Sequence, residues 1–160
     1  MEIAGHLAFD QGLSDLTGFE QDGREFAVVG LIDSIAATFV DITDPVNPVE
    51  IGSITGTPST WRDLKYWNRH VYIGTEAQDG VKVISVDDPD NPVLVHTITD
   101  FTNNHNIHID AEGYLYVVGA ADHDLWIYDL SNPSEPDLVG AWEGEYLHDI
   151  EVYNNKLYGA

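Results

Sequence analysis

Asp44-Pro45-Val46-Asn47-Pro48 is followed along the chain by Asp88-Pro89-Asp90-Asn91-Pro92 and then by Asn132-Pro133-Ser134-Glu135-Pro136. The first prolines of the three copies are 44 residues apart both times. An internal period of this size is typical of stacked or radially arranged units rather than of one mixed domain. Proline fixes its own φ, and Asp or Asn before it can bond to its own backbone, so each copy is predicted to be a turn.

Each 44-residue unit also contains four short runs rich in β-branched and aromatic residues. In the second and third units these runs lie at 63–67, 71–74, 81–86, 93–98, 106–110, 114–120, 125–130 and 137–142. Short runs of this kind between turn residues are predicted strands. Four antiparallel strands per unit at this period predict a blade of a β-propeller, and no helix is expected.

The predicted fold is therefore all-β, an incomplete propeller ring of about three and a half four-stranded blades. Within one domain spanning 1–160, the expected parts are the last strand of a preceding blade (1–9), three blades (14–56, 60–100, 104–143) and a half blade (147–160). Because a ring usually has at least four blades, we expect a fragment of a longer propeller, with the missing blades of the parent chain as its neighbours. The alternative is an open stack that pairs with a second copy, since bare terminal strands favour aggregation.

Composition limits the possible partners. The chain has 160 residues, 43% of them hydrophobic, which suffices for a core, and 28 acidic against 6 basic residues give a net charge of −22. Such a polyanion repels nucleic acid and anionic membrane surfaces, so neither is an expected partner. No apolar run is long enough for direct membrane insertion, and the absence of cysteine rules out disulfide and thiolate chemistry. The acidic surface is interpreted as solvating, with divalent-cation binding as the alternative.

Polar residues recur where the innermost strand of each blade is predicted to begin. They are Asp15, Trp61, Arg62, Asp63, His105, Asn106, His148 and Asp149. In a propeller these positions surround one mouth of the central channel, so they are predicted to converge. Three interpretations stay open: hydrogen bonds that tie blades together, a ligand or partner pocket, and a metal site.

The metal interpretation rests on Asp63, His105, His148 and Asp149. Neutral His with Asp suits Zn or another transition metal, and carboxylate with Asn oxygens suits Ca, so Ca or Zn is a possible cofactor and none is firmly predicted. Ligand spacing such as His-Glu-x-x-His is absent. For Arg62, an ion pair with Asp63 or with an acid of a neighbouring blade competes with recognition of an anionic ligand.

Several further residues carry structural expectations. Asp41, Ser85 and Asp129 share one repeat position and are expected to accept bonds from turn backbone N–H groups. Trp126 and Trp142 are expected to pack between blades. Asp90, Asp122 and Asp124 are candidate ligands of a loop calcium, although the Asp-x-Asn-x-Asp-Gly loop is missing.

Two runs, 38–49 and 125–133, resemble the LVIVD repeat. An ordered set of motifs resembles the propeller of the choice-of-anchor B family: Asp15, 24–31, 61–63, 105–107 and 148–149. This resemblance, which spans nearly the whole chain, implies a secreted or surface-displayed bacterial or archaeal propeller. Complete chains of that family are longer and carry a signal peptide and a carboxy-terminal anchoring segment, so an extracellular or cell-surface location is implied.

Catalytic motifs are missing from the sequence. It has no cysteine nucleophile, no Gly-x-Ser-x-Gly elbow and no glycine-rich phosphate loop. The favoured function is a non-enzymatic binding or interaction scaffold that presents loops and the channel mouth to a protein or glycan partner. The alternative is a metal-dependent hydrolase that uses His and Asp at the channel mouth with a metal-bound water.

Overall fold

The structure is a computed structural model that describes residues 3–120 and 123–160, and within these ranges it contains strands and no helix. Accordingly, the described chain has no helix that could cross a membrane. In chain order the strands are β1 (Leu13–Gln21), β2 (Arg24–Leu31), β3 (Ile35–Asp41), β4 (Val49–Thr55), β5 (Arg62–Trp67), β6 (His70–Thr75), β7 (Val81–Ser85), β8 (Val93–Ile98), β9 (Asn106–Ile109), β10 (Tyr114–Val118), β11 (Leu125–Asp129), β12 (Asp137–Trp142), β13 (Ile150–Tyr153) and β14 (Lys156–Gly159).

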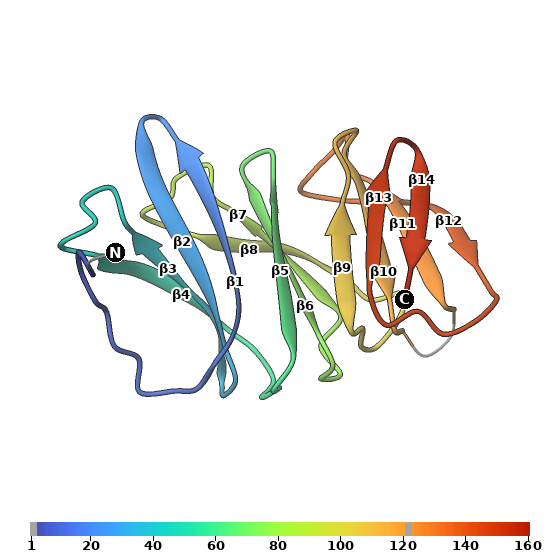
Figure 1. Ribbon diagram of the computed structural model, residues 1–160, viewed down its shortest axis with the longest axis horizontal. Helices are drawn as coiled ribbons and strands as arrows, with labels where there is room; N and C mark the ends of the chain where they lie inside the picture. Colours follow the sequence, from blue (N-terminus) through green and yellow to red (C-terminus); the bar gives the residue numbers. More distant parts are fainter. Residues whose placement is uncertain (1–2, 121–122) are drawn as a thin grey trace.

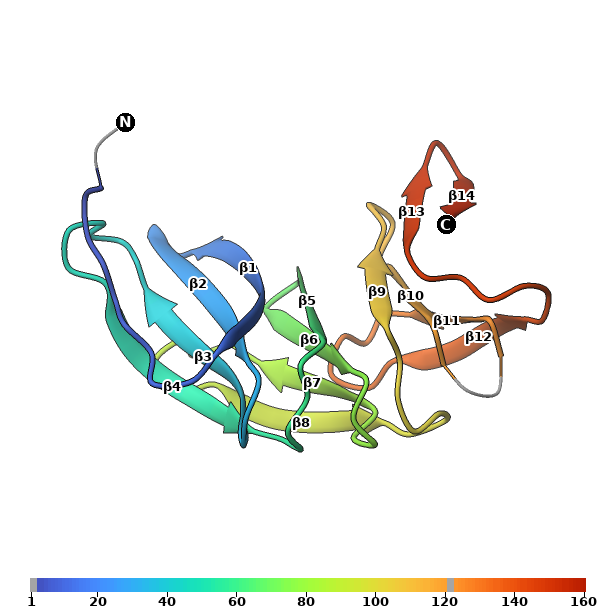
Figure 2. The ribbon, with the colours of Figure 1, turned by 60° about the horizontal axis from the view of Figure 1, so that its bottom comes forward.

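The strands form three four-stranded antiparallel sheets and one two-stranded hairpin, and within each sheet they follow chain order. We call them the first blade (β1–β4), second blade (β5–β8), third blade (β9–β12) and half blade (β13–β14). The innermost strands are neighbours, since β1 contacts β5, β5 contacts β9 and β9 contacts β13 (Figure 1). The outermost strands β4, β8 and β12 lie along the outer side of the arc (Figure 2). This arrangement confirms the predicted fold class, an incomplete propeller of all-β blades.

The hydrophobic core lies between the blades rather than inside any one of them. Strand β6 is buried at all six positions because a neighbouring blade covers each face of its sheet. One cluster joins the first two blades and includes Phe26, Phe39, Leu64 and Ile84. A second joins the second and third blades and includes Tyr72, Val83, Ile107, Trp126 and Tyr128. A single blade could not bury these side chains alone, so the blades stabilise one another.

The repeated turn has the same hydrogen bonds in each blade. Near its start, the expected side-chain caps are formed by three bonds: Thr43 N to Asp41 Oδ1 (2.9 Å), Asp87 N to Ser85 Oγ (3.3 Å) and Ser131 N to Asp129 Oδ1 (2.7 Å). Within the Pro link, the main-chain bonds are Asn47 N to Asp44 O (3.0 Å), Asn91 N to Asp88 O (3.0 Å) and Glu135 N to Asn132 O (3.1 Å). The capping role predicted from the sequence is confirmed.

The strand expected near the start of the chain is not formed: residues 3–12 have no strand structure. A strand needs a partner ladder, and among the described residues no strand pairs with this segment. The segment instead packs on the first blade, where Gly5 approaches the carbonyl oxygen of Pro45 and the ring of Pro48.

The two tryptophans expected between blades differ in environment. Trp126 is 7% exposed and packs in the cluster between the second and third blades, as predicted. Trp142, in β12, is 46% exposed, so the prediction was wrong for this residue. The reason is that the two-stranded half blade covers less of the third blade than a four-stranded blade would.

An ion-pair network also joins the first two blades. Arg24 of β2 contacts Asp41 Oδ2 (2.6 Å) and, in the Pro link of the second blade, Asp90 Oδ1 (2.8 Å). Hydrogen bonds from Thr43 and then from Arg24 lower the pKa of Asp41 from 3.8 to about 2. The bond from Arg24 also lowers the pKa of Asp90.

This network predicts a pH dependence. A carboxyl whose pKa is lower in the folded than in the unfolded chain stabilises the fold above the unfolded value of 3.8, and that contribution is lost as the pH falls through about 2. The stability difference between the wild type and Asp41→Asn should therefore shrink between pH 5 and pH 2 in urea unfolding. Glu50→Gln, on exposed β4, is the control. A difference that stayed constant over this range would contradict the assignment.

Two glycines offer a matched test of how the turn before β7 packs within the second blade. Gly23 and Gly80 both have φ in the left-handed region, at 80° and 60°. A Cβ at Gly23 would meet open space, whereas one at Gly80 would collide with the carbonyl oxygen of Ile98. We expect Gly23→Ala to cost about 1 kcal/mol and Gly80→Ala about 3 kcal/mol of unfolding free energy. Equal losses in urea titrations would show that the turn before β7 is not held against β8.

Candidate binding site at the channel mouth

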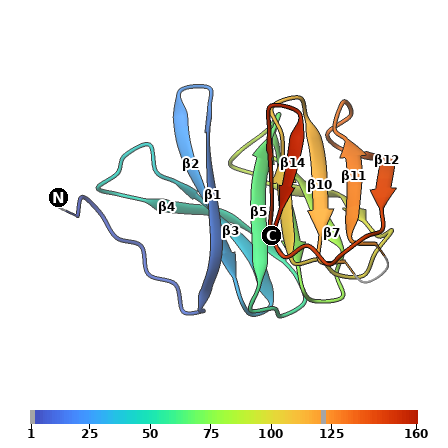
Figure 3. The ribbon, with the colours of Figure 1, turned by 45° about the vertical axis from the view of Figure 1, so that its right-hand side comes forward.

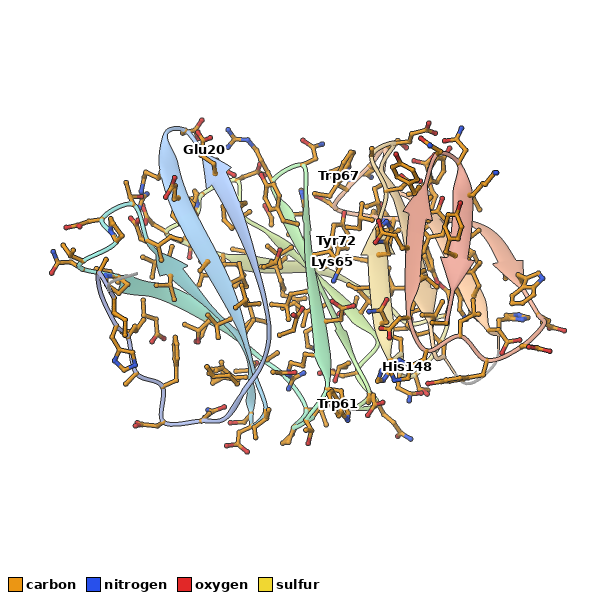
Figure 4. All side chains as sticks on the ribbon, in the orientation of Figure 1. Glu20, Trp61, Lys65, Trp67, Tyr72 and His148 are labelled. Atoms are coloured by element: carbon orange, nitrogen blue, oxygen red, sulfur yellow. The ribbon has the colours of Figure 1, made fainter. Side chains whose placement is uncertain are left out.

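A cavity of about 530 Å³ lies where the innermost strands begin. Figure 4 shows Trp61 and His148 at the same end of these strands. All eight residues that the sequence predicted to converge line it: Asp15, Trp61, Arg62, Asp63, His105, Asn106, His148 and Asp149. Three blades and the half blade thus contribute to one cavity, although the residues are spread over more than 130 positions of the chain.

Two of the carboxylates tie β1 to β5 and β5 to β9. Asp15 Oδ2 accepts a bond from Leu64 N (2.8 Å), and Asp63 Oδ2 accepts one from Ile107 N (2.8 Å). Asp63 Oδ2 also accepts from Asn106 Nδ2 (2.7 Å), while Asn106 Oδ1 is buried without a hydrogen-bond partner. Asp15 and Asp63 therefore have the structural role considered for the mouth residues: their carboxylates tie neighbouring blades together by hydrogen bonds.

Asp63 is buried, and its other oxygen pairs with Lys65. Burial raises the pKa of Asp63 above its usual value of 3.8, and the charge of Lys65 opposes this shift. A carboxyl with a raised pKa is less stable in its charged form in the folded than in the unfolded chain. Asp63 therefore destabilises the fold as the pH rises through its pKa, while its hydrogen bonds hold the blades in register.

Arg62 forms no ion pair with Asp63, one of the alternatives considered for it, and its guanidinium instead donates to backbone carbonyls. The side chain is buried, and its Nε donates to Leu31 O at 2.6 Å. Its Nη2 donates to Thr57 O (2.8 Å) and Asp33 O (3.3 Å). Burial lowers the pKa of Arg62. The partners of the guanidinium are thus backbone carbonyls of the first blade and of the following loop. The sequence pattern could not identify these partners.

The most accessible side chains of the mouth are Trp61, His148 and Asp149, and the ring of His105 lies beside them. The Trp61 indole is 57% exposed, and its ring centroid lies 6.0 Å from that of His105. The His105 and His148 rings are 4.0 Å apart. His105 Nδ1 donates to Glu76 Oε1 (2.7 Å), and His148 Nδ1 donates to Asp149 Oδ2 (2.7 Å). Both imidazoles are thus oriented by carboxylates, which leaves their Nε2 atoms for other contacts.

Glu76 was not predicted as part of the site. It directly follows β6, and its N–H donates to Trp61 O (3.4 Å), which places it at the same end of the second blade. The antiparallel pairing of β5 and β6 could have predicted its position. In such a pair, the residue after one strand lies beside the residue before the other, which places Glu76 beside Trp61.

The metal set proposed from the sequence does not fit the geometry. Within 3–120 and 123–160, no three His, Asp or Glu side chains are grouped as metal ligands. Asp63 also has its oxygens engaged by Ile107, Asn106 and Lys65. Of the loop-calcium candidates, Asp90 pairs with Arg24 and Asp124 accepts from Gly144 N, and Asp122 lies outside the described residues.

Together, these observations define an arc of β-propeller blades with a polar and aromatic cavity at the channel mouth. Residues 106–143, most of the third blade, match the model of the LVIVD repeat. A search of curated proteins finds no match. Among solved structures, the chain is similar to "Crystal structure of a thermostable family-43 glycoside hydrolase", with a TM-score of 0.49 and 14% sequence identity. The similarity covers 89% of this chain and 56% of that one, so the chain spans little more than half of that structure.

The blade-tying role of Asp63 is testable by substitution. Asp63→Ala leaves the buried Ile107 N–H without an acceptor, which should cost about 2 kcal/mol of unfolding free energy. Asp63→Asn keeps an acceptor oxygen and should recover most of that loss. Asp149→Ala, at the equivalent but exposed position, should change the unfolding free energy by less than about 0.5 kcal/mol. Urea titrations in which Asp149→Ala is as damaging as Asp63→Ala would contradict this role.

Proposed function

We propose that the chain belongs to a non-enzymatic, secreted or cell-surface β-propeller that acts as a binding scaffold, with the channel mouth as its contact site. The observation that carries the proposal is the exposed indole of Trp61 beside the His105 and His148 rings in a cavity of about 530 Å³. Loops and strand ends that converge on a rigid propeller are a common location for recognition.

The chemistry of the mouth favours a protein or glycan partner. An exposed indole provides a flat face for a sugar ring or for a basic side chain. Four carboxylates lie around the two imidazoles and the indole: Asp15, Asp63, Glu76 and Asp149. With a net charge of −22, the chain should repel anionic partners and attract basic ones, and the charge does not oppose binding of a neutral glycan.

The location and the finer family assignment rest on the choice-of-anchor B resemblance. The LVIVD match at residues 106–143 supports the repeat class on which that resemblance is built. The motifs of the mouth, from Asp15 to Asp149, are the other support. An extracellular scaffold would also be consistent with the acidic surface, which favours solubility.

A binding titration with defined probes tests the scaffold. The probes are a neutral hexasaccharide panel, a lysine-rich peptide and a sulfated oligosaccharide, followed by calorimetry and tryptophan fluorescence. We expect saturable binding of a neutral glycan or of the basic peptide, no binding of the sulfated one, and at least about a tenfold loss of affinity in Trp61→Ala.

Trp142→Ala is the matched control, since it removes an exposed indole that does not line the mouth. Equal losses in both variants, or no saturable binding of the neutral and basic probes, would refute the proposal. Release of reducing sugar from any hexasaccharide would favour the hydrolase alternative instead.

A further inference from the structure

One face of the third blade differs from the same face of the other two blades. The 44-residue period makes Ile54, Ile98 and Trp142 equivalent, at the end of each outermost strand. Ile54 is 9% and Ile98 2% exposed, and each packs against the following blade, whereas Trp142 is 46% exposed. Ile127 shows the same contrast, because it is half-buried while its equivalents Phe39 and Val83 are fully buried. We call Tyr116, Leu125, Ile127 and Trp142 the open face.

The open face borders a groove of about 510 Å³ between the third blade and the half blade. Figure 3 shows the β13–β14 hairpin in front of the third blade. Leu157 of β14 lines the groove from the other side and is partly exposed, whereas its equivalents Val71 and Leu115 are completely buried. Both walls of the groove are therefore positions that the other units keep out of water.

A hydrogen bond changes in the same place. In the second blade, Tyr72 donates its hydroxyl to Pro133 O (2.8 Å), in the Pro link of the next blade. The equivalent Tyr116 donates to Asp110 Oδ2 (2.9 Å), within its own blade. Tyr116 of the third blade is thus the equivalent of a hydroxyl donor, Tyr72, that holds the Pro link of the following blade.

We infer that the open face is a blade–blade interface, and that its occupant is the outer strand pair of the unit whose inner pair is β13–β14. That strand pair resembles β7–β8 and β11–β12 and brings its own Asx-Pro link over Tyr116. It pairs with β14 as β7 pairs with β6 and β11 with β10. The two equivalent interfaces inside this chain show which kind of segment fits.

A second copy of the chain fits the open face less well. Its outer strand pairs β3–β4, β7–β8 and β11–β12 are already hydrogen-bonded to their own inner strands. A copy would have to open one of its blades to supply a strand pair, at the cost of that ladder.

The inference is tested by completing the fourth unit. Since Ile150 pairs with Gly159 as Leu64 pairs with Ile73, Ala160 is equivalent to Gly74. A duplicate of residues 75–101, which contains no tryptophan, is therefore appended after Ala160. In a background with Trp61→Phe and Trp67→Phe, which leaves only the buried Trp126 beside Trp142, acrylamide quenching of the tryptophan fluorescence should decrease. Hydrogen exchange of 156–159 should slow by about tenfold, as expected for a strand that gains a partner.

The matched control carries Ile84→Asp and Val86→Asp only in the appended duplicate, because these positions face the preceding blade. The control should leave Trp142 as accessible as in the parent chain. Unchanged quenching and exchange in the unmodified extension would overturn the inference. Sedimentation gives a second measurement: the parent chain should be monomeric, and a dimer dissolved by Ile127→Glu would assign the open face to a second copy instead.

Discussion

The packing of each blade on the next is the constraint on which the rest of the structure depends. A four-stranded sheet with apolar side chains on both faces cannot be stable alone, because both faces would then be exposed to water. In the second blade, neighbours cover both faces, and all of β6 is buried as a result. The carboxylates of Asp15 and Asp63 fix the register of this packing through the N–H groups of Leu64 and Ile107.

The same constraint creates the cavity at the channel mouth. The carboxylates that tie one innermost strand to the next lie where these strands begin, so they share one cavity with the accessible side chains of the mouth. The buried Asp63 accepts a bond from a backbone amide, and the buried Arg62 donates to backbone carbonyls. Trp61 and His148, by contrast, are exposed. The division follows burial, since a buried charge needs several hydrogen-bond partners and an exposed ring does not.

Much of the fold could be predicted from the sequence because the 44-residue repeat shows which distant residues occupy equivalent positions. The Pro links located the strands, and equivalent positions predicted that Asp15, His105 and Asp149 would converge. The partners of individual side chains were less predictable. Arg62 bonds to carbonyls of an adjacent blade, and Trp142 is exposed because too little covers it; both depend on three-dimensional neighbours that a period does not identify. The strand expected at 1–9 does not form in its described part, residues 3–9, for the same reason, since strand propensity does not supply a partner ladder.

The direction of the carboxylate ties gives the arc a head and a tail. Each bond runs from an Asp of one blade to the strand that follows it in the chain, so the two faces of a blade are chemically different. Contacts between unlike faces are heterologous, and they either continue indefinitely or close when the rotation per unit divides a full circle. Assemblies of such units therefore have polarity: they grow by addition of a leading face to a trailing one, and only a closed circle leaves neither face bare.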